Sequence, residues 1–298
     1  MHKLRLTIFA SLTTLAFVAP TRAELIYAVN GNNELLTFDS IAPAAILSRT
    51  AINTHGNDAI LNIDFRPATG QLYGLSGNNN LYVINPGTGG ASLVGATGIT
   101  GGFDYGFDFN PVGDRIRVAT GGDRFFRVDP ITSVATSGGQ LHYNAGDQNA
   151  EAVPQITGAA YANNFLPSPR TPPPGTELFY IDSRLDILAL SSIANNRDLT
   201  TVGALGLDVT GLLGFDISGI TGGAFASFST DGNISGLYTI DLASGTATSL
   251  GMIGESILDI SAAAVPAATV PDFGSTTVLL GISALGLLYF RQRLGIKA

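Results

Sequence analysis

The sequence contains no cysteine, and long windows with apolar residues at helical spacing are missing between Glu24 and Ala264. Without cysteine the 298-residue chain can form no disulfide, thiolate metal site or cysteine nucleophile, so a large core must stabilise it. Apolar residues make up 45% of the chain, which is enough for such a core. Together with 37 glycines and 14 prolines, the missing helical periodicity predicts many short strands joined by turns.

Lysine is absent between Glu24 and Val270, where 9 arginines stand against 22 acidic residues. This stretch therefore carries a net charge of −13, against −8 for the whole chain, because six basic residues lie near the two ends. An acidic surface repels phosphate backbones and anionic lipid, so the composition argues against nucleic acid as a partner. Cations and neutral glycans are compatible with it.

What the chain does contain is a repeated unit of four short apolar strands. The most regular copy runs from Ile60 to Gly95, with clusters of turn-forming residues between its strands. Further copies begin near Leu25, Gly106, Ile156 and Gly214. A period of roughly 40 to 50 residues made of four strands is typical of radial propellers.

The two ends of the repeat region complement each other. The first copy lacks its innermost strand, and one unassigned strand, Ile257 to Ser261, follows the last copy. If this strand joins the first sheet, the ring closes and both sheet edges are covered. The sequence therefore predicts that residues 24–264 form an all-β fold, a β-propeller of five four-stranded antiparallel blades. Six blades would require the long fourth copy to contain a further sheet.

Residues 1–23 have the pattern of a secretory signal peptide. A basic start precedes an apolar run from Leu6 to Ala19, and the small residues Thr21 and Ala23 stand at positions that a signal peptidase inspects. The pattern predicts an exported protein that is cleaved after Ala23.

The other end of the chain resembles a known sorting signal. A linker over residues 265–276 precedes an apolar run and an arginine-rich end within residues 277–298. The run is shorter than the roughly 20 residues of a comfortable membrane span, so it predicts a marginal anchor. The linker matches six of seven positions of the V-P-D-S-G-S-T variant of PEP-type tails, with Phe273 in place of a serine: Val270, Pro271, Asp272, Gly274, Ser275 and Thr276.

This resemblance implies a partner and a location. In families with such tails, an exosortase-type protease cleaves the motif, and the bacteria make exopolysaccharide. The tail would anchor the protein in the membrane transiently, and the processed protein would be at the cell surface or outside the cell.

Four aspartates stand at what the repeat marks as one position of the innermost strand: Asp64, Asp108, Asp216 and Asp259. The innermost strands of a propeller line its channel, so these carboxylates are predicted to converge around the axis. Like charges there would raise their pKa values or bind a cation such as Ca²⁺. Alternatively, each aspartate bonds backbone amides of the neighbouring blade and recurs because the unit was duplicated.

The same carboxylates leave a glycosidase open as an alternative, because some five-bladed propellers hydrolyse glycosides with carboxylates across the channel. However, copies at equal depth have similar environments, whereas a general acid and a general base need different ones. A nucleophile elbow, a P-loop and a dinucleotide-binding fingerprint are all missing from the sequence. A non-catalytic protein is therefore favoured.

A loop between the third and fourth copies is a second candidate site. Asp147, Asn149 and Glu151 alternate there and could supply oxygen ligands to Ca²⁺, although the loop lacks the length and glycine of the helix-loop-helix calcium site. His55 and His142 stand alone, without zinc-site spacing.

One hairpin holds a concentration of arginines: Arg115, Arg117, Arg124 and Arg127. Aspartates are interleaved with them, which favours a salt-bridged face in contact with solvent over an anion site.

Three segments resemble a family of exported bacterial proteins catalogued as a domain of unknown function: Gly113–Val118, Gly158–Asn164 and Leu237–Gly245. The resemblance covers the chain from Leu25 to Ala264 and implies a propeller-like fold outside the cytoplasm, with no catalytic residues and no cofactor to transfer. We therefore expect a secreted, surface-sorted, non-catalytic protein that binds extracellular polysaccharide or matrix components. A propeller glycoside hydrolase and a purely structural matrix protein are the alternatives.

Overall fold

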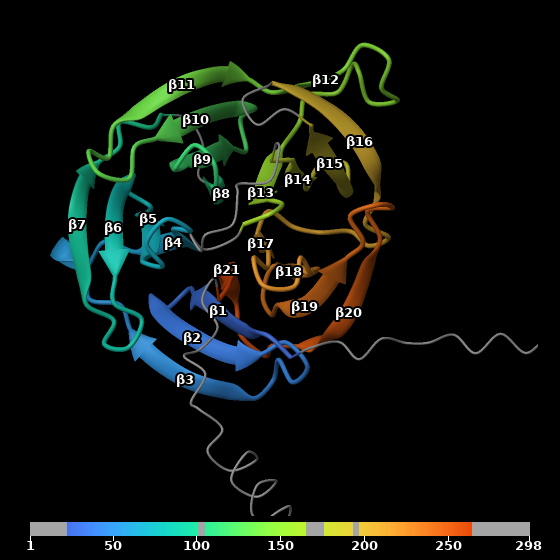
Figure 1. Cartoon of the computed structure of the whole chain (residues 1–298). Helices are drawn as coiled ribbons and strands as arrows, with labels where there is room; N and C mark the ends of the chain where they lie inside the picture. The colour runs from blue at the N-terminus through green and yellow to red at the C-terminus, as the bar shows by residue number, and fades with distance from the viewer. Residues whose placement is uncertain (1–22, 101–104, 165–175, 193–196, 264–298) are drawn as a thin grey trace, which may run out of the picture.

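The computed structural model describes residues 23–100, 105–164, 176–192 and 197–263. In this part of the chain, five antiparallel sheets stand around a central axis as the blades of a propeller (Figure 1). The predicted fold of five blades is confirmed, and the alternative of six is wrong. Among the described residues, no helix has the length and apolar character to cross a membrane. The predicted signal peptide, sorting motif and apolar tail lie outside these residues, except for Ala23, which is exposed.

The strands of each blade follow one another from the innermost, beside the axis, to the outermost, at the rim. Blade 1 consists of β21 (Ile257–Ala262), β1 (Leu25–Asn30), β2 (Glu34–Asp39) and β3 (Ile46–Ala51). Blade 2 consists of β4 (Ile60–Phe65), β5 (Leu72–Ser76), β6 (Asn80–Ile84) and β7 (Ala91–Ala96). Blade 3 consists of β8 (Tyr105–Asn110), β9 (Arg115–Thr120), β10 (Arg124–Val128) and β11 (Ala135–Gln140).

The remaining blades follow the same order. Blade 4 consists of β13 (Ile156–Tyr161), β14 (Leu178–Asp182), β15 (Ile187–Ser191) and β16 (Asp198–Ala204). Blade 5 consists of β17 (Leu213–Ile217), β18 (Ala224–Phe228), β19 (Gly236–Ile240) and β20 (Ala247–Met252). A short strand, β12 (His142–Tyr143), pairs in parallel with β16, and a single 3₁₀ turn, η1 (His55–Asn57), precedes blade 2.

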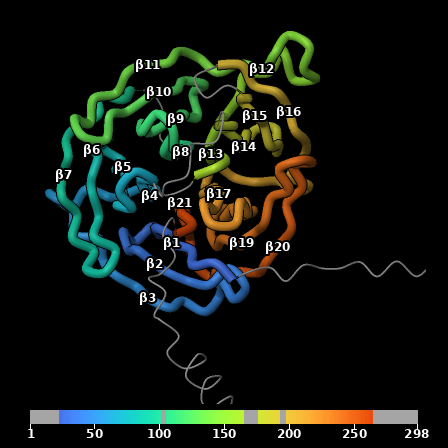
Figure 2. Tube along the Cα trace, in the orientation of Figure 1, coloured from blue at the N-terminus to red at the C-terminus, as the bar shows by residue number. Residues whose placement is uncertain are grey.

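The ring closes through blade 1, as the sequence predicts. β21 pairs antiparallel with β1, and their register places Ala262 opposite Ile26 and Ser261 opposite Tyr27. The trace in Figure 2 shows the red C-terminal strand inside the blue N-terminal sheet. The two ends of the described chain are therefore held in one sheet, and opening the ring would break that sheet.

The hydrophobic core lies between the blades, and each of its clusters joins two neighbours. One cluster, for example, joins Val29 and Leu35 of blade 1 to Ile63 and Tyr82 of blade 2. The inner strands are buried on both faces, which explains why β8 and β13 are buried along their whole length. Unlike the inner strands, β3 at the rim is exposed or partly exposed along its whole length and contains no buried residue.

Every outermost strand pairs with its neighbour through an irregular register. The register between the third and fourth strand shifts in all five blades, for example between Phe125 and Phe126. Such bulges increase twist and blunt an edge that could otherwise pair with another chain. These irregular outer strands therefore disfavour pairing between the sheet edges of two molecules.

Candidate functional site

Three aspartates of the inner strands reach across to the next blade. Asp64 accepts a hydrogen bond from the Phe109 amide at 2.8 Å, and Asp108 accepts one from the Tyr161 amide at 3.2 Å. Asp216 accepts one from the Ala262 amide at 2.6 Å. The carboxylates thus join neighbouring inner strands, as the structural interpretation of the repeat expects. Their recurrence needs no catalytic explanation.

Asp259 does not occupy the same position, so that prediction is wrong. In β21 it is Ser261 that lies opposite Tyr27, as Asp64 lies opposite Tyr73 in blade 2. A register shift near Asn30 in blade 1 matches the shift at the start of β4, and Asp259 therefore corresponds to Asn62. Its carboxylate accepts the Ile63 amide at 3.0 Å and still joins two blades.

Ser261 links two of the carboxylates. Its Oγ lies 2.9 Å from Asp64 Oδ1 and 3.1 Å from Asp216 Oδ2. A serine hydroxyl has one proton, so it can donate to only one of two ionised carboxylates. A proton retained on Asp64 or Asp216 would satisfy both contacts. The geometry therefore favours a pair that shares one proton across Ser261.

The environment of these acids favours their neutral forms. None of the four is more than 4% exposed. Burial raises the pKa of Asp64 well above its usual value, and the charge of Asp216 raises it further. Burial also raises the pKa of Asp216, to about 7. Asp108 and Asp259 have pKa values shifted in the same direction, again mainly by burial, and Asp108 Oδ1 has no hydrogen-bond partner among the described residues.

A cavity lies beside the inner strands, and its lining residue Asn62 donates a hydrogen bond to Asp259. The cavity measures about 210 Å³, and all five blades contribute to its lining. Its lining among the described residues consists of Leu61, Asn62, Tyr105, Thr157, Gly211, Leu212, Leu213 and Leu258. Four of these residues are leucines, and none is acidic.

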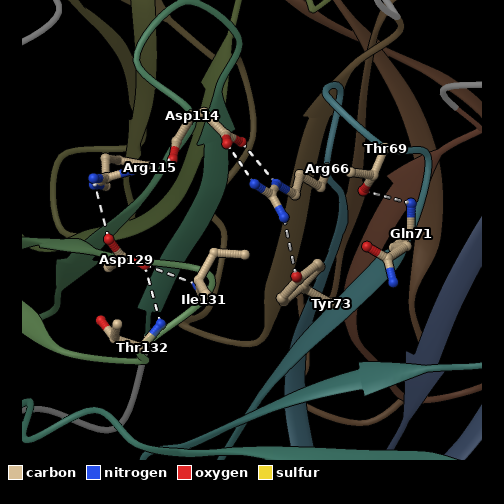
Figure 3. A network of polar contacts seen from close by, with 9 residues as sticks. All are labelled: Arg66, Thr69, Gln71, Tyr73, Asp114, Arg115, Asp129, Ile131 and Thr132. Atoms are coloured by element: carbon tan, nitrogen blue, oxygen red, sulfur yellow. Dashed lines mark hydrogen bonds and ion pairs between the residues drawn. The ribbon is translucent and has the colours of Figure 1, made fainter.

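A second depression lies on the outer strands of blade 3. It measures about 380 Å³ and is lined by Arg115, Arg127, Asp129, Thr132, Val134 and Thr136. Figure 3 shows Arg115 directed at Asp129, an ion pair of 3.1 Å, while Asp129 also accepts the amides of Ile131 and Thr132. We call this depression the blade 3 groove.

Beside the blade 3 groove, Arg66 connects blade 2 to blade 3 (Figure 3). Its guanidinium donates to both carboxylate oxygens of Asp114 and to the Tyr73 hydroxyl, which joins the end of β4 to the first turn of blade 3. Arg66 is buried, so this bidentate pair fixes one blade against the next.

Comparison with known proteins assigns the family. The family model described as Domain of unknown function (DUF4394) matches residues 34–262. The chain belongs to this family. The predicted resemblance to a family of unknown function is thereby confirmed, and the DUF4394 match spans the propeller except for β1 at its start. No curated protein matches the sequence.

Solved structures with similar shapes are distant in sequence. A chain from a crystal structure titled as a nidogen/laminin complex is 11% identical, with a TM-score of 0.49 and coverage of 81% of this chain and 98% of the other. A structural genomics protein of unknown function from Bacteroides thetaiotaomicron is 13% identical, with a TM-score of 0.46 and coverage of 78% and 55%. These identities are too low to transfer a function to the DUF4394 domain.

The loop between blades 3 and 4 of the DUF4394 domain is hydrogen-bonded to β16, the outermost strand of blade 4. Asp147 accepts the Thr201 amide at 2.7 Å, the Thr201 hydroxyl at 2.7 Å and the Asn149 amide at 2.9 Å. Burial opposes ionisation here, but these bonds outweigh it and hold the Asp147 pKa below its usual value. Asn149 also bonds Thr201, whereas Glu151 is exposed. Nowhere in the described ranges do three or more His, Asp or Glu residues converge as a metal site.

Two features of the DUF4394 domain were missed in the sequence. The sequence did not point to Ser261, because an aspartate followed by Ile or Phe aligns Asp259 with Asp64. Alignment of the strand ends places Ser261 at the position of Asp64 instead. Arg117 is 1% exposed, with its guanidinium 4.2 Å from the Phe125 ring centre and its Nε donating to the Tyr161 hydroxyl. The predicted solvent face of the arginine hairpin is thus wrong for Arg117. Alternation in strands β9 and β10 places Arg117 with Arg115 and Arg127 on one face, which was the usable signal.

Proposed function

We propose that this propeller is an exported, non-catalytic module that binds extracellular polysaccharide or matrix components. The observation that carries the proposal is the use of the channel carboxylates. Their oxygens accept backbone amides of neighbouring blades, and they are almost completely removed from solvent. A glycosidase needs two carboxyl groups that reach the scissile bond, one of them with space for water or for a covalent sugar adduct. Carboxylates already engaged in closing the ring do not meet that requirement.

A turnover assay separates the proposal from a channel glycosidase. The purified protein is incubated with a panel of bacterial polysaccharides, and released reducing ends are measured beside binding by affinity electrophoresis. We expect retarded migration without release of reducing ends. Turnover that is lost in Asp64→Asn or Asp216→Asn but kept in the surface control Asp123→Asn would establish the hydrolase instead. A purely structural protein would show neither binding nor turnover.

The location is part of the same proposal and has its own test. The basic and apolar start of the chain and the tail motif around Val270 to Ser275 support export followed by sorting at the surface. In the source bacterium, we expect mass spectrometry of the surface fraction to find a mature N-terminus at Glu24. Deletion of residues 270–298 should abolish surface retention without changing that N-terminus. A protein that keeps Met1, or that is retained equally without the tail, would contradict export and sorting respectively.

A further inference from the structure

The blade 3 groove has a counterpart in blade 2 with a different lining. That second groove measures about 340 Å³ and includes Gln71, Val83, Asn85, Gly90 and Ser92. The strand registers place Val83 where blade 3 has Arg127 and Ser92 where it has Thr136. Gln71 corresponds to Arg115, since each lies two residues before the cross-strand partner, Tyr73 or Arg117. Asn85 corresponds to Asp129, since each lies two residues after Val83 or Arg127. The repeat therefore produces the groove, whereas blade 3 alone of these two blades lines it with arginines.

Folding alone does not account for Arg127. Arg127 lies directly opposite Arg117 on the neighbouring strand, and Arg115 is two residues from Arg117 on the same face. Like charges at directly opposite positions destabilise a sheet. The neutral valine at the matching position of blade 2 shows that the fold does not require a cation there. Arg115 is balanced by Asp129, and Arg117 by the Phe125 ring and the Tyr161 hydroxyl, so Arg127 is the charge that local contacts leave unexplained.

Arg127 also has no ion-pair partner in the part of the chain that the structure describes. It is partly buried, and no described residue forms an ion pair or hydrogen bond with its guanidinium. Arg115, by comparison, already pairs with Asp129. The rest of the groove offers the hydroxyls of Thr132 and Thr136 and the exposed apolar side chain of Val134.

We propose that the blade 3 groove binds an acidic sugar residue of an extracellular polysaccharide, with Arg127 on its carboxylate and Arg115, held by Asp129 and the Asp114 carbonyl, beside it. This rests on the proposed function and narrows it to a class of ligand. A planar guanidinium matches a carboxylate by two parallel hydrogen bonds. The threonines would bond ring hydroxyls, and Val134 would pack against the C–H face of the sugar. The net charge of −13 repels dense polyanions, so the fitting chain has well-spaced acidic residues among neutral ones.

The experiment uses hyaluronan, in which each glucuronate alternates with a neutral sugar, and hyaluronan whose carboxylates have been reduced to alcohols. Titration calorimetry is run at about 0.05 M and about 0.5 M NaCl on the wild-type protein. The test variant, Arg115→Gln with Arg127→Val, gives blade 3 the lining that blade 2 already has at both positions. The control variant, Arg124→Gln, removes a charge from the same strand but outside the groove.

We expect hyaluronan to bind the wild-type protein and the Arg124→Gln control equally. The double variant should bind hyaluronan at least about tenfold more weakly, and the wild-type protein should bind the carboxyl-reduced polymer at least about tenfold more weakly. Wild-type binding of hyaluronan should be weaker at about 0.5 M than at about 0.05 M NaCl. Equal binding by the double variant, or equal binding of the reduced polymer, would overturn the groove assignment and leave the proposed function standing. If neither polymer nor any polysaccharide of the turnover panel binds, the proposed function fails, and the groove assignment with it.

Discussion

Replacing Gly214 by alanine will destabilise the ring more than the same change at the other inner-strand glycines, Gly106 and Gly158. A Cβ at this position would lie 2.4 Å from the Ile260 nitrogen and 2.7 Å from the Asp259 Cα. Both are backbone atoms of β21, which is held on its other side by β1. Neither strand can move away without breaking the closing sheet or the contact between blades 5 and 1. We expect a loss of about 3 kcal/mol or more in the free energy of unfolding.

Chemical denaturation followed by circular dichroism measures this effect, with soluble yield as the second readout if the variant does not fold. Gly31→Ala is the matched control, because nothing lies within 4 Å of a Cβ built there and its backbone is not left-handed. That variant should be neutral or slightly more stable, since alanine restricts the unfolded chain. Equal midpoints for the two variants would show that the inner strands can separate freely.

The difference between these glycines also shows how far the sequence could be interpreted. Strand number, blade number and ring closure follow from turn residues and from the unassigned strand Ile257–Ser261, because a missing edge and a spare strand have one economical solution. The close approach at Gly214 does not follow from periodicity. At the corresponding positions, blades 3 and 4 have Gly106 and Gly158, whereas blades 2 and 1 have Asn62 and Asp259.

The candidate sites were less predictable than the fold. The sequence left two roles open for the inner aspartates, a site in the channel or acceptors for amides of the next blade. The choice depends on which oxygen faces which amide, and only the structure shows that. The groove depends on a cross-strand neighbour, Arg127 opposite Arg117, which requires the register of β9 and β10. A sequence repeat shows which residues occupy equivalent positions in different blades. These sites depend instead on which residues of neighbouring strands and blades lie next to each other in space.

The folded protein will be more resistant to heat at pH 5 than at pH 8. The pKa of Asp216 is raised by burial to about 7, well above the value of about 3.9 expected for an unfolded chain. The folded state therefore binds this proton more tightly than the unfolded state does. Its stabilising contribution is complete below about pH 4 and is lost as the pH rises through about 7.

The size of the effect follows from the same shift. Between pH 8 and pH 5, Asp216 alone should contribute about 2 to 3 kcal/mol. For a domain of this size that corresponds to a rise of roughly 5 to 10 °C in Tm. Below about pH 4 the trend should reverse, because turn aspartates such as Asp129 and Asp241 have pKa values lowered by bonds from backbone amides and lose those bonds on protonation.

Asp216→Asn tests whether the channel, rather than the general acidity of the protein, causes the trend. Asparagine is neutral at every pH, so this variant should lose the share of the Tm difference between pH 5 and pH 8 that comes from Asp216. The other three buried aspartates, whose pKa values are also raised, should keep the rest. Asp123→Asn removes the same charge from a partly exposed turn residue whose positive φ asparagine tolerates, and it should keep the wild-type profile. A wild-type Tm that is flat or rises toward pH 8 would mean that the Asp64–Ser261–Asp216 link holds no shared proton. If Asp216→Asn alone flattens the profile, the acids that join the blades act as a pair, and alkaline conditions loosen the ring where β17 meets β21.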